Sequence, residues 1–127
     1  MHKSILVLEE SSIVHELFES ALPEGKWVWE IHHESSPDNY LGKIETLVPD
    51  VIFLSNQDQK RGYPVVKGID KNSDLNHIPI ILLTTARDQL NEAFLEAKGV
   101  AGFIRKPFES TVLLDQLEAV LDHNVMG

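Results

Sequence analysis

The sequence predicts an α/β domain in which helices cover both faces of a five-stranded parallel sheet. Five short runs rich in β-branched residues recur at fairly even intervals, and each is followed by a stretch with helical spacing. Four of these runs are nearly continuously apolar, which is typical of parallel strands buried on both faces. The regular alternation of strand and helix predicts right-handed crossovers between the strands.

The five strands are predicted at residues 5–8, 27–31, 51–54, 80–83 and 101–104. In the second strand Trp27, Trp29 and Ile31 alternate, so both indoles are expected on one side of the sheet. We expect that side to pack against the covering helices. The alternative is an exposed aromatic site for a protein partner.

The first two helices have recognisable starts. Ser11 or Ser12 can cap the first, which is expected to end near Pro23. Ser36 and Pro37 indicate the cap and the first position of the second helix. The residues of the first helix that we expect to face inward are Ile13, Val14, Leu17, Phe18 and Ala21.

The remaining three helices are predicted from similar start and stop signals. Residues 62–64 are predicted to open the third, which carries Val65, Val66 and Ile69. The fourth is expected from about residue 87 to residue 98, and the following glycine ends it. Ser110 is the predicted cap of the fifth.

Length and charge narrow the class of protein. A chain of 127 residues is long enough for one domain with a real core and too short for two. Its formal net charge of −9 argues against nucleic acid or an anionic membrane as the main partner. It has no cysteine, and its apolar runs are too short for a signal peptide or a membrane span. A soluble cytoplasmic protein is therefore expected.

Polar residues follow four of the predicted strands. Glu9 and Glu10 come after the first strand, Ser55 after the third, Thr84 after the fourth and Lys106 after the fifth. In such a sheet, functional groups collect beyond the carboxyl ends of the strands. Two carboxylates, two hydroxyls and an ammonium group are thus predicted to meet at one crevice.

The whole chain resembles a response-regulator receiver domain of bacterial two-component signalling. The resemblance is carried by residues 4–11, 49–55, 77–84 and 102–108, and Lys106-Pro107 is its most specific part. It implies a flavodoxin-like (βα)5 fold with strand order 2-1-3-4-5. We expect a single receiver-like domain over residues 1–127, with no output domain attached.

The resemblance also implies roles for these residues. In the family an acidic pair and an acceptor aspartate hold Mg²⁺, a lysine neutralises the phosphoryl group, a threonine moves to bind it, and an aromatic side chain then turns inward. The matching residues are Glu9, Glu10, Ser55, Lys106, Thr84 and Phe103. The adjacent Thr85 is an alternative to Thr84, which the spacings to Pro79 and Gly99 favour.

This chain departs from the family at the chemical centre. Ser55 stands where the phosphoacceptor aspartate is expected, and a neutral hydroxyl is a weak nucleophile without an activating base. Two glutamates lengthen the acidic pair, and the loop over residues 56–62 has Gln59 where the family usually has proline. We therefore expect weak or absent Mg²⁺ binding, no other cofactor, and no phosphorylation in the family's manner.

Lys106 is expected to form an ion pair with Glu9 or Glu10 that holds the crevice without a phosphate. The alternative is that both glutamates are solvated loop residues. The histidines suggest no metal site, because His32 and His33 point to opposite faces of a strand and no other pair has ligand spacing. Solvated or capping histidines, and no metal, are expected.

The leading hypothesis is a pseudo-receiver, a signalling module that binds a protein partner without phosphorylation and has no enzymatic activity. Its partner is expected on the face formed by the fourth helix, the fifth strand and the fifth helix. One alternative is a phosphorelay receiver phosphorylated by an unusual route, at Ser55 or at Asp58. Another is a flavodoxin-like cofactor binder, but two carboxylates and no glycine follow the first strand, which would repel a flavin phosphate.

Overall fold

The structure, a computed structural model, describes residues 2–22, 28–55, 59–85, 100–106 and 110–126. Only the backbone is described for residues 59–63, 85, 106, 110 and 122–126. The predicted fourth helix, Trp27, Gln57 and Asp58 lie outside the described residues.

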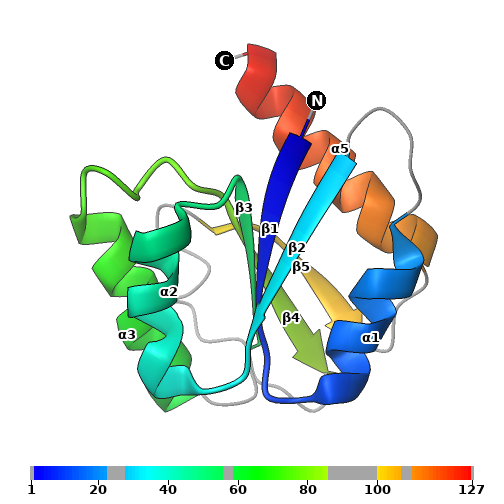
Figure 1. The fold of residues 1–127 in the computed structure, drawn as a ribbon. Coiled ribbons are helices and arrows are strands. Elements are labelled where there is room, and N and C mark those ends of the chain that lie inside the picture. Colours follow the sequence, from blue (N-terminus) through cyan, green and yellow to red (C-terminus); the bar gives the residue numbers. More distant parts are fainter. Residues whose placement is uncertain (1, 23–27, 56–58, 86–99, 107–109, 127) are drawn as a thin grey trace.

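The described strands form one parallel sheet in the order β2-β1-β3-β4-β5, as predicted. Their bounds are β1 (His2–Leu8), β2 (Val28–Glu34), β3 (Val51–Ser55), β4 (Ile80–Thr85) and β5 (Val100–Lys106). The second strand extends further than predicted, because β2 runs on through His32 and His33 and pairs with the whole of β1 (Figure 1).

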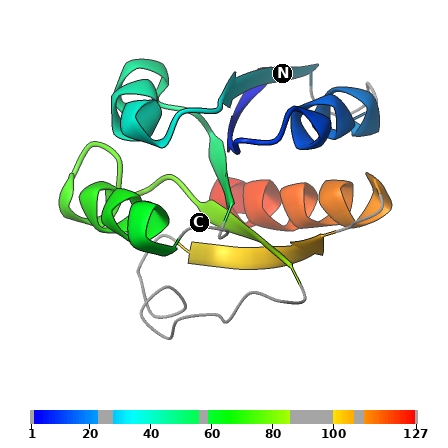
Figure 2. The same cartoon turned by 90° about the horizontal axis from the view of Figure 1, so that it is seen from below.

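The helices lie on both faces of the sheet. They are α1 (Ser12–Ala21), α2 (Tyr40–Leu47), α3 (Gln59–Lys71) and α5 (Ser110–Met126), with a 3₁₀ helix η1 (Pro37–Asn39) before α2. Figure 2 shows α2 and α3 on one side of the sheet and α1 and α5 on the other. Crossovers of this kind leave the carboxyl ends of all five strands at one edge.

Two helix starts differ from the prediction. Pro37 begins a short 3₁₀ helix, and the α-helix itself begins at Tyr40. α3 begins at Gln59, before residues 62–64, and contains Pro64. A proline deprives a helix of one backbone donor, but the buried side chains of Val65, Val66 and Ile69 hold this helix against the sheet.

The core consists of two clusters separated by the sheet. Along β1, Ile5 and Val7 pack toward α1 and α5, whereas Leu6 and Leu8 pack toward α2 and α3. This alternation is what a strand covered on both faces requires. Phe18 of α1 meets Phe53 of β3 edge to face, with ring centroids 4.8 Å apart.

The prediction that Ile13 faces inward is wrong, because its side chain is 75% exposed. The inward stripe of α1 runs through Val14, Phe18 and Ala21, at spacings of four and three residues, and Ile13 lies off this stripe. Trp29 and Ile31 of β2 are partly buried against the cluster on the α1 and α5 face, as expected. In the described segments, no helix has both the length and the apolarity to cross a bilayer.

Candidate functional site

The polar residues predicted at the strand ends occupy one edge of the sheet. Ser55 is the last residue of β3 and lies beside Leu83 of β4. Thr84 follows Leu83, and Glu9 comes directly after β1, which lies beside β3. Lys106 ends β5, where its backbone pairs with Thr85. The backbone register thus brings the ends of four neighbouring strands to the same edge.

Glu9 is buried and makes hydrogen bonds through both its backbone and its side chain. Its side chain is fully buried. Its backbone N–H donates to the carbonyl of Glu34 at 3.1 Å, and its own carbonyl accepts from Nε2 of His15 at 2.6 Å. Oε1 of the carboxylate accepts from the backbone N–H of Ser11 at 3.2 Å.

These contacts decide, for Glu9, the alternative that both glutamates are solvated loop residues. That interpretation is wrong for Glu9, whose carboxylate is enclosed, whereas Glu10 is exposed. The turn that brings the N–H of Ser11 back to Glu9 explains why one carboxylate points inward. The side chain of Lys106 lies outside the described part, so its ion pair with either glutamate stays a prediction.

The two residues matched to the switch differ sharply in exposure. Thr84 is 2% exposed, whereas the ring of Phe103 on β5 is 46% exposed. An irregularity in the β4–β5 pairing leaves Ala101 without a partner, so Gly102 lies beside Ile81 and Phe103 beside Leu82. Phe103 therefore holds an outward position on the strand that ends in Lys106.

A cluster that the sequence did not reveal adjoins Glu9. His15 of α1 and His33 of β2 contact each other through their Nδ1 atoms, and Nε2 of His33 binds Oε1 of Glu19 at 2.9 Å. The two histidines are 18 residues apart in sequence, so ligand spacing along the chain could not pair them. The available signal was that His33 alternates with Trp29 and Ile31, the predicted inward side of that strand.

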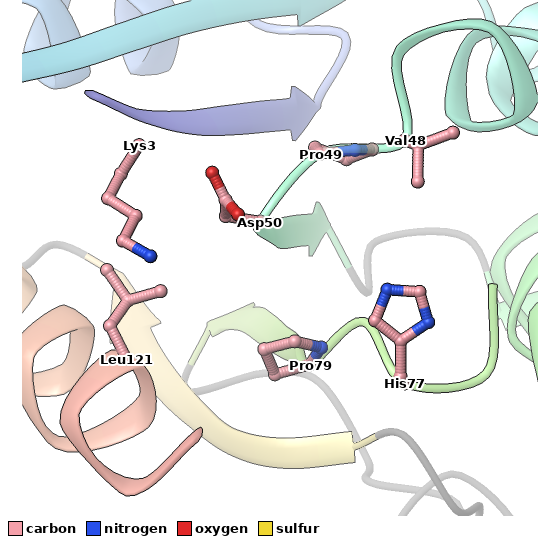
Figure 3. A pocket seen from close by; sticks show the side chains of 7 residues that line it. All are labelled: Lys3, Val48, Pro49, Asp50, His77, Pro79 and Leu121. Atoms are coloured by element: carbon pink, nitrogen blue, oxygen red, sulfur yellow. The ribbon is translucent and has the colours of Figure 1, made fainter. Parts of the chain in front are cut away.

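A cavity of about 220 Å³ lies at the opposite edge of the sheet, near the amino ends of the strands (Figure 3). Lys3, Asp50 and His77 line it together with apolar side chains. One oxygen of the Asp50 carboxylate, Oδ2, accepts a hydrogen bond from the backbone N–H of Ser4 at 2.8 Å. Because the cavity lies at the amino ends of the strands, it is separate from the polar residues at the carboxyl ends.

Comparisons with known proteins establish the family. The family model of the response regulator receiver domain matches residues 5–118, so this chain belongs to that family. Chemotaxis protein CheY1 of Helicobacter pylori is 25% identical over 122 residues, which are 94% of this chain and 98% of that protein.

Solved structures agree with this assignment. The signal receiver domain of a signal transduction histidine kinase from Syntrophus aciditrophicus is 27% identical, with a TM-score of 0.75 over 95% of this chain and 91% of that one. Chemotaxis response regulator CheY4 of Vibrio cholerae shares the fold with a TM-score of 0.80 at 24% identity, over 95% of this chain and 100% of that one. The protein is a receiver domain of two-component signalling, similar in sequence to CheY1 and in fold to CheY4.

Proposed function

We propose that this receiver domain is a protein-interaction module that is not phosphorylated on an aspartate. The observation that carries the proposal is Ser55, the last residue of β3, at the position matched to the phosphoacceptor. A serine hydroxyl attacks a phosphoryl donor poorly without a base, and its phosphate ester does not turn over as an acyl phosphate does. The domain thus keeps the family's fold and lacks its usual chemical input.

The oxygen donors at the strand ends do not fit the magnesium ion of the family. Mg²⁺ takes oxygen ligands in near-octahedral geometry at short distances. Here Ser55 offers a neutral hydroxyl, and Oε1 of the buried Glu9 already accepts a hydrogen bond from Ser11. Glu10 is exposed. This donor set supports weak or absent Mg²⁺ binding, and we assign the domain no catalytic residue and no enzymatic activity.

The partner surface that we propose is the face of β5, α5 and residues 87–98, where the sequence predicts the fourth helix outside the described residues. Two apolar side chains of its described part reach solvent, Phe103 at 46% and Val112 at 42% exposure. The outward ring of Phe103 is the arrangement that the family resemblance associates with a receiver before phosphorylation. A partner that binds this domain in the cytoplasm would recognise that state.

The proposal is tested on the protein isolated from its own cells. Hydroxylamine cleaves acyl phosphates and leaves serine esters intact, so intact mass before and after treatment distinguishes the two. We expect no hydroxylamine-sensitive phosphoryl group. Such a group would overturn the proposal and would send the search to Asp58 or another carboxylate. A hydroxylamine-resistant group on Ser55 would instead support the alternative of an unusual phosphorelay.

A further inference from the structure

The imidazole rings of His15 and His33 meet edge to face beside the loop that carries Glu9. Their centroids are 4.2 Å apart with an interplanar angle of 80°, and the two Nδ1 atoms are in direct contact. His15 is the fourth residue of α1, and His33 lies beside Val7 in the β1–β2 pairing. Two consecutive elements of the chain, α1 and β2, therefore present one ring nitrogen each to the same point.

The outer nitrogen of each ring is already committed to an acceptor. Nε2 of His15 faces the carbonyl oxygen of Glu9 at 2.6 Å, and Nε2 of His33 faces Oε1 of Glu19 at 2.9 Å. A carbonyl and a carboxylate oxygen can only accept, so each Nε2 carries its ring's hydrogen. A neutral imidazole has one such hydrogen, which leaves a lone pair on each Nδ1.

Two converging lone pairs repel each other unless a shared proton or a metal ion lies between them. Metal-bound histidines in proteins usually donate their second ring N–H to a carboxylate or a backbone carbonyl, which fixes the tautomer and the direction of the ring. Both rings have this arrangement, one with Glu9 and the other with Glu19. Imidazole nitrogen is a preferred ligand for Zn²⁺, Cu²⁺ and Ni²⁺.

We propose that His15 and His33 form a site for a divalent transition metal ion of this group, bound through both Nδ1 atoms. With metal–nitrogen bonds of 2.0–2.1 Å and a tetrahedral angle, the two atoms would stand roughly 3.3 Å apart, so the rings separate from their direct contact when the ion binds. The Glu19 carboxylate, whose side chain is 59% exposed, adds compensating negative charge.

The site has two protein ligands. Among the described residues no group of three or more histidine, aspartate or glutamate side chains is arranged to hold a metal. The His33 side chain is 26% exposed, so water can complete the coordination. Binding is therefore weaker than at a structural zinc site with four protein ligands. The ion joins α1 to β2, and through His15 it reaches the carbonyl of Glu9.

The test is a calorimetric titration of the full chain, freed of metal by a chelator, with Cu²⁺ and separately with Zn²⁺. We expect one ion per chain, with Cu²⁺ the tighter of the two. His15→Ala and His33→Ala should each abolish this binding. Glu19→Ala should weaken it roughly tenfold, which is the usual effect of losing a partner of a metal-bound histidine. His32→Ala is the matched control and should bind as the wild type does, because His32 lies beside Leu6 on the other face of the sheet.

A second readout does not depend on alanine variants that fold poorly. Zn²⁺ added to the ¹⁵N-labelled wild type should shift the Nδ1 signals of His15 and His33 and leave the Nε2 protons in place. His15→Gln and His33→Gln keep a polar side chain and should lose the same shift. Unchanged Nδ1 signals would overturn the proposal, because a shared proton would then hold the pair together. An equal loss of binding in His32→Ala would also overturn the proposal, because the ion would then be adsorbed at the surface and not bound between His15 and His33.

Discussion

Nε2 of His15 donates a hydrogen bond of 2.6 Å to the backbone carbonyl of Glu9, which ties helix α1 to the end of strand β1. The side chain of Glu9 also accepts a hydrogen bond from the backbone N–H of Ser11, and the backbone N–H of Glu9 donates one to the carbonyl of Glu34. Glu9 is therefore held at its N–H, carbonyl and carboxylate, and it is the buried member of the acidic pair.

The two glutamates should respond differently to neutralisation. Because Glu9 is buried and Glu10 is exposed, we predict that Glu9→Gln lowers the free energy of unfolding by about 1–3 kcal/mol, the usual cost of disturbing a buried polar group. Glu10→Gln should change it by less than about 0.5 kcal/mol. Urea denaturation measures both values. A double-mutant cycle of Glu9→Gln with Lys106→Met then tests the predicted ion pair with Glu9, and additive effects would exclude that pair and leave Glu10 as the partner to test.

Two glycines in helices should differ when replaced by alanine. A Cβ at Gly42 in α2 meets nothing within 4 Å, so Gly42→Ala should stabilise the protein by about 0.5–1 kcal/mol through helix propensity. At Gly68 in α3 the same Cβ lies 3.1 Å from Cδ2 of Leu41, so the gain should be smaller or absent. Thermal denaturation of the two variants gives the comparison. Equal gains would mean that α2 and α3 are less closely packed than described.

Val48 adopts an unusual backbone conformation. It is the C-cap of α2 with φ 43° and ψ 65°, a left-handed region that costs a residue with a Cβ about 1–2 kcal/mol. Since its side chain is 48% exposed, Val48→Gly should raise the free energy of unfolding by about 1 kcal/mol. Val28→Gly is the control, because Val28 is 47% exposed but lies in β2, where glycine should destabilise. Loss of stability in both variants would contradict the strain at Val48.

The contact between Phe18 and Phe53 should be measurable as a coupling. Both rings are fully buried, and their edge-to-face geometry favours a coupling of about 0.5–1.5 kcal/mol beyond the area that they bury. A double-mutant cycle of Phe18→Leu and Phe53→Leu, followed by urea denaturation, measures it. Phe18→Leu combined with Ile44→Val, which lies in the other core cluster, should be additive.

The sequence predicted the sheet well because its signals were local. The apolar runs around Ile5 and Val51 are typical of strands buried on both faces, and the order of the strands followed from the family resemblance. The position of Ile13 was mispredicted because one apolar residue at the start of a helix carries little information about the direction of the buried stripe.

Other features depended on how turns and neighbouring elements place the side chains. The burial of Glu9 comes from a turn to Ser11 and from a helix that brings His15 against it. The meeting of His15 with His33 depends on the register between β1 and β2, which no spacing in the sequence contains. Residue types at the strand ends were readable from the sequence, whereas their burial was not.

The most direct test of the account is the intact mass of the purified protein after incubation with acetyl phosphate and Mg²⁺. Ser55→Asp is measured beside the wild type, and a receiver domain known to accept phosphate from this donor serves as the positive control. The account predicts no phosphoryl adduct on the wild type. An adduct on Ser55→Asp alone would identify the missing carboxylate as the block. A phosphoryl adduct on the wild type would contradict the central claim.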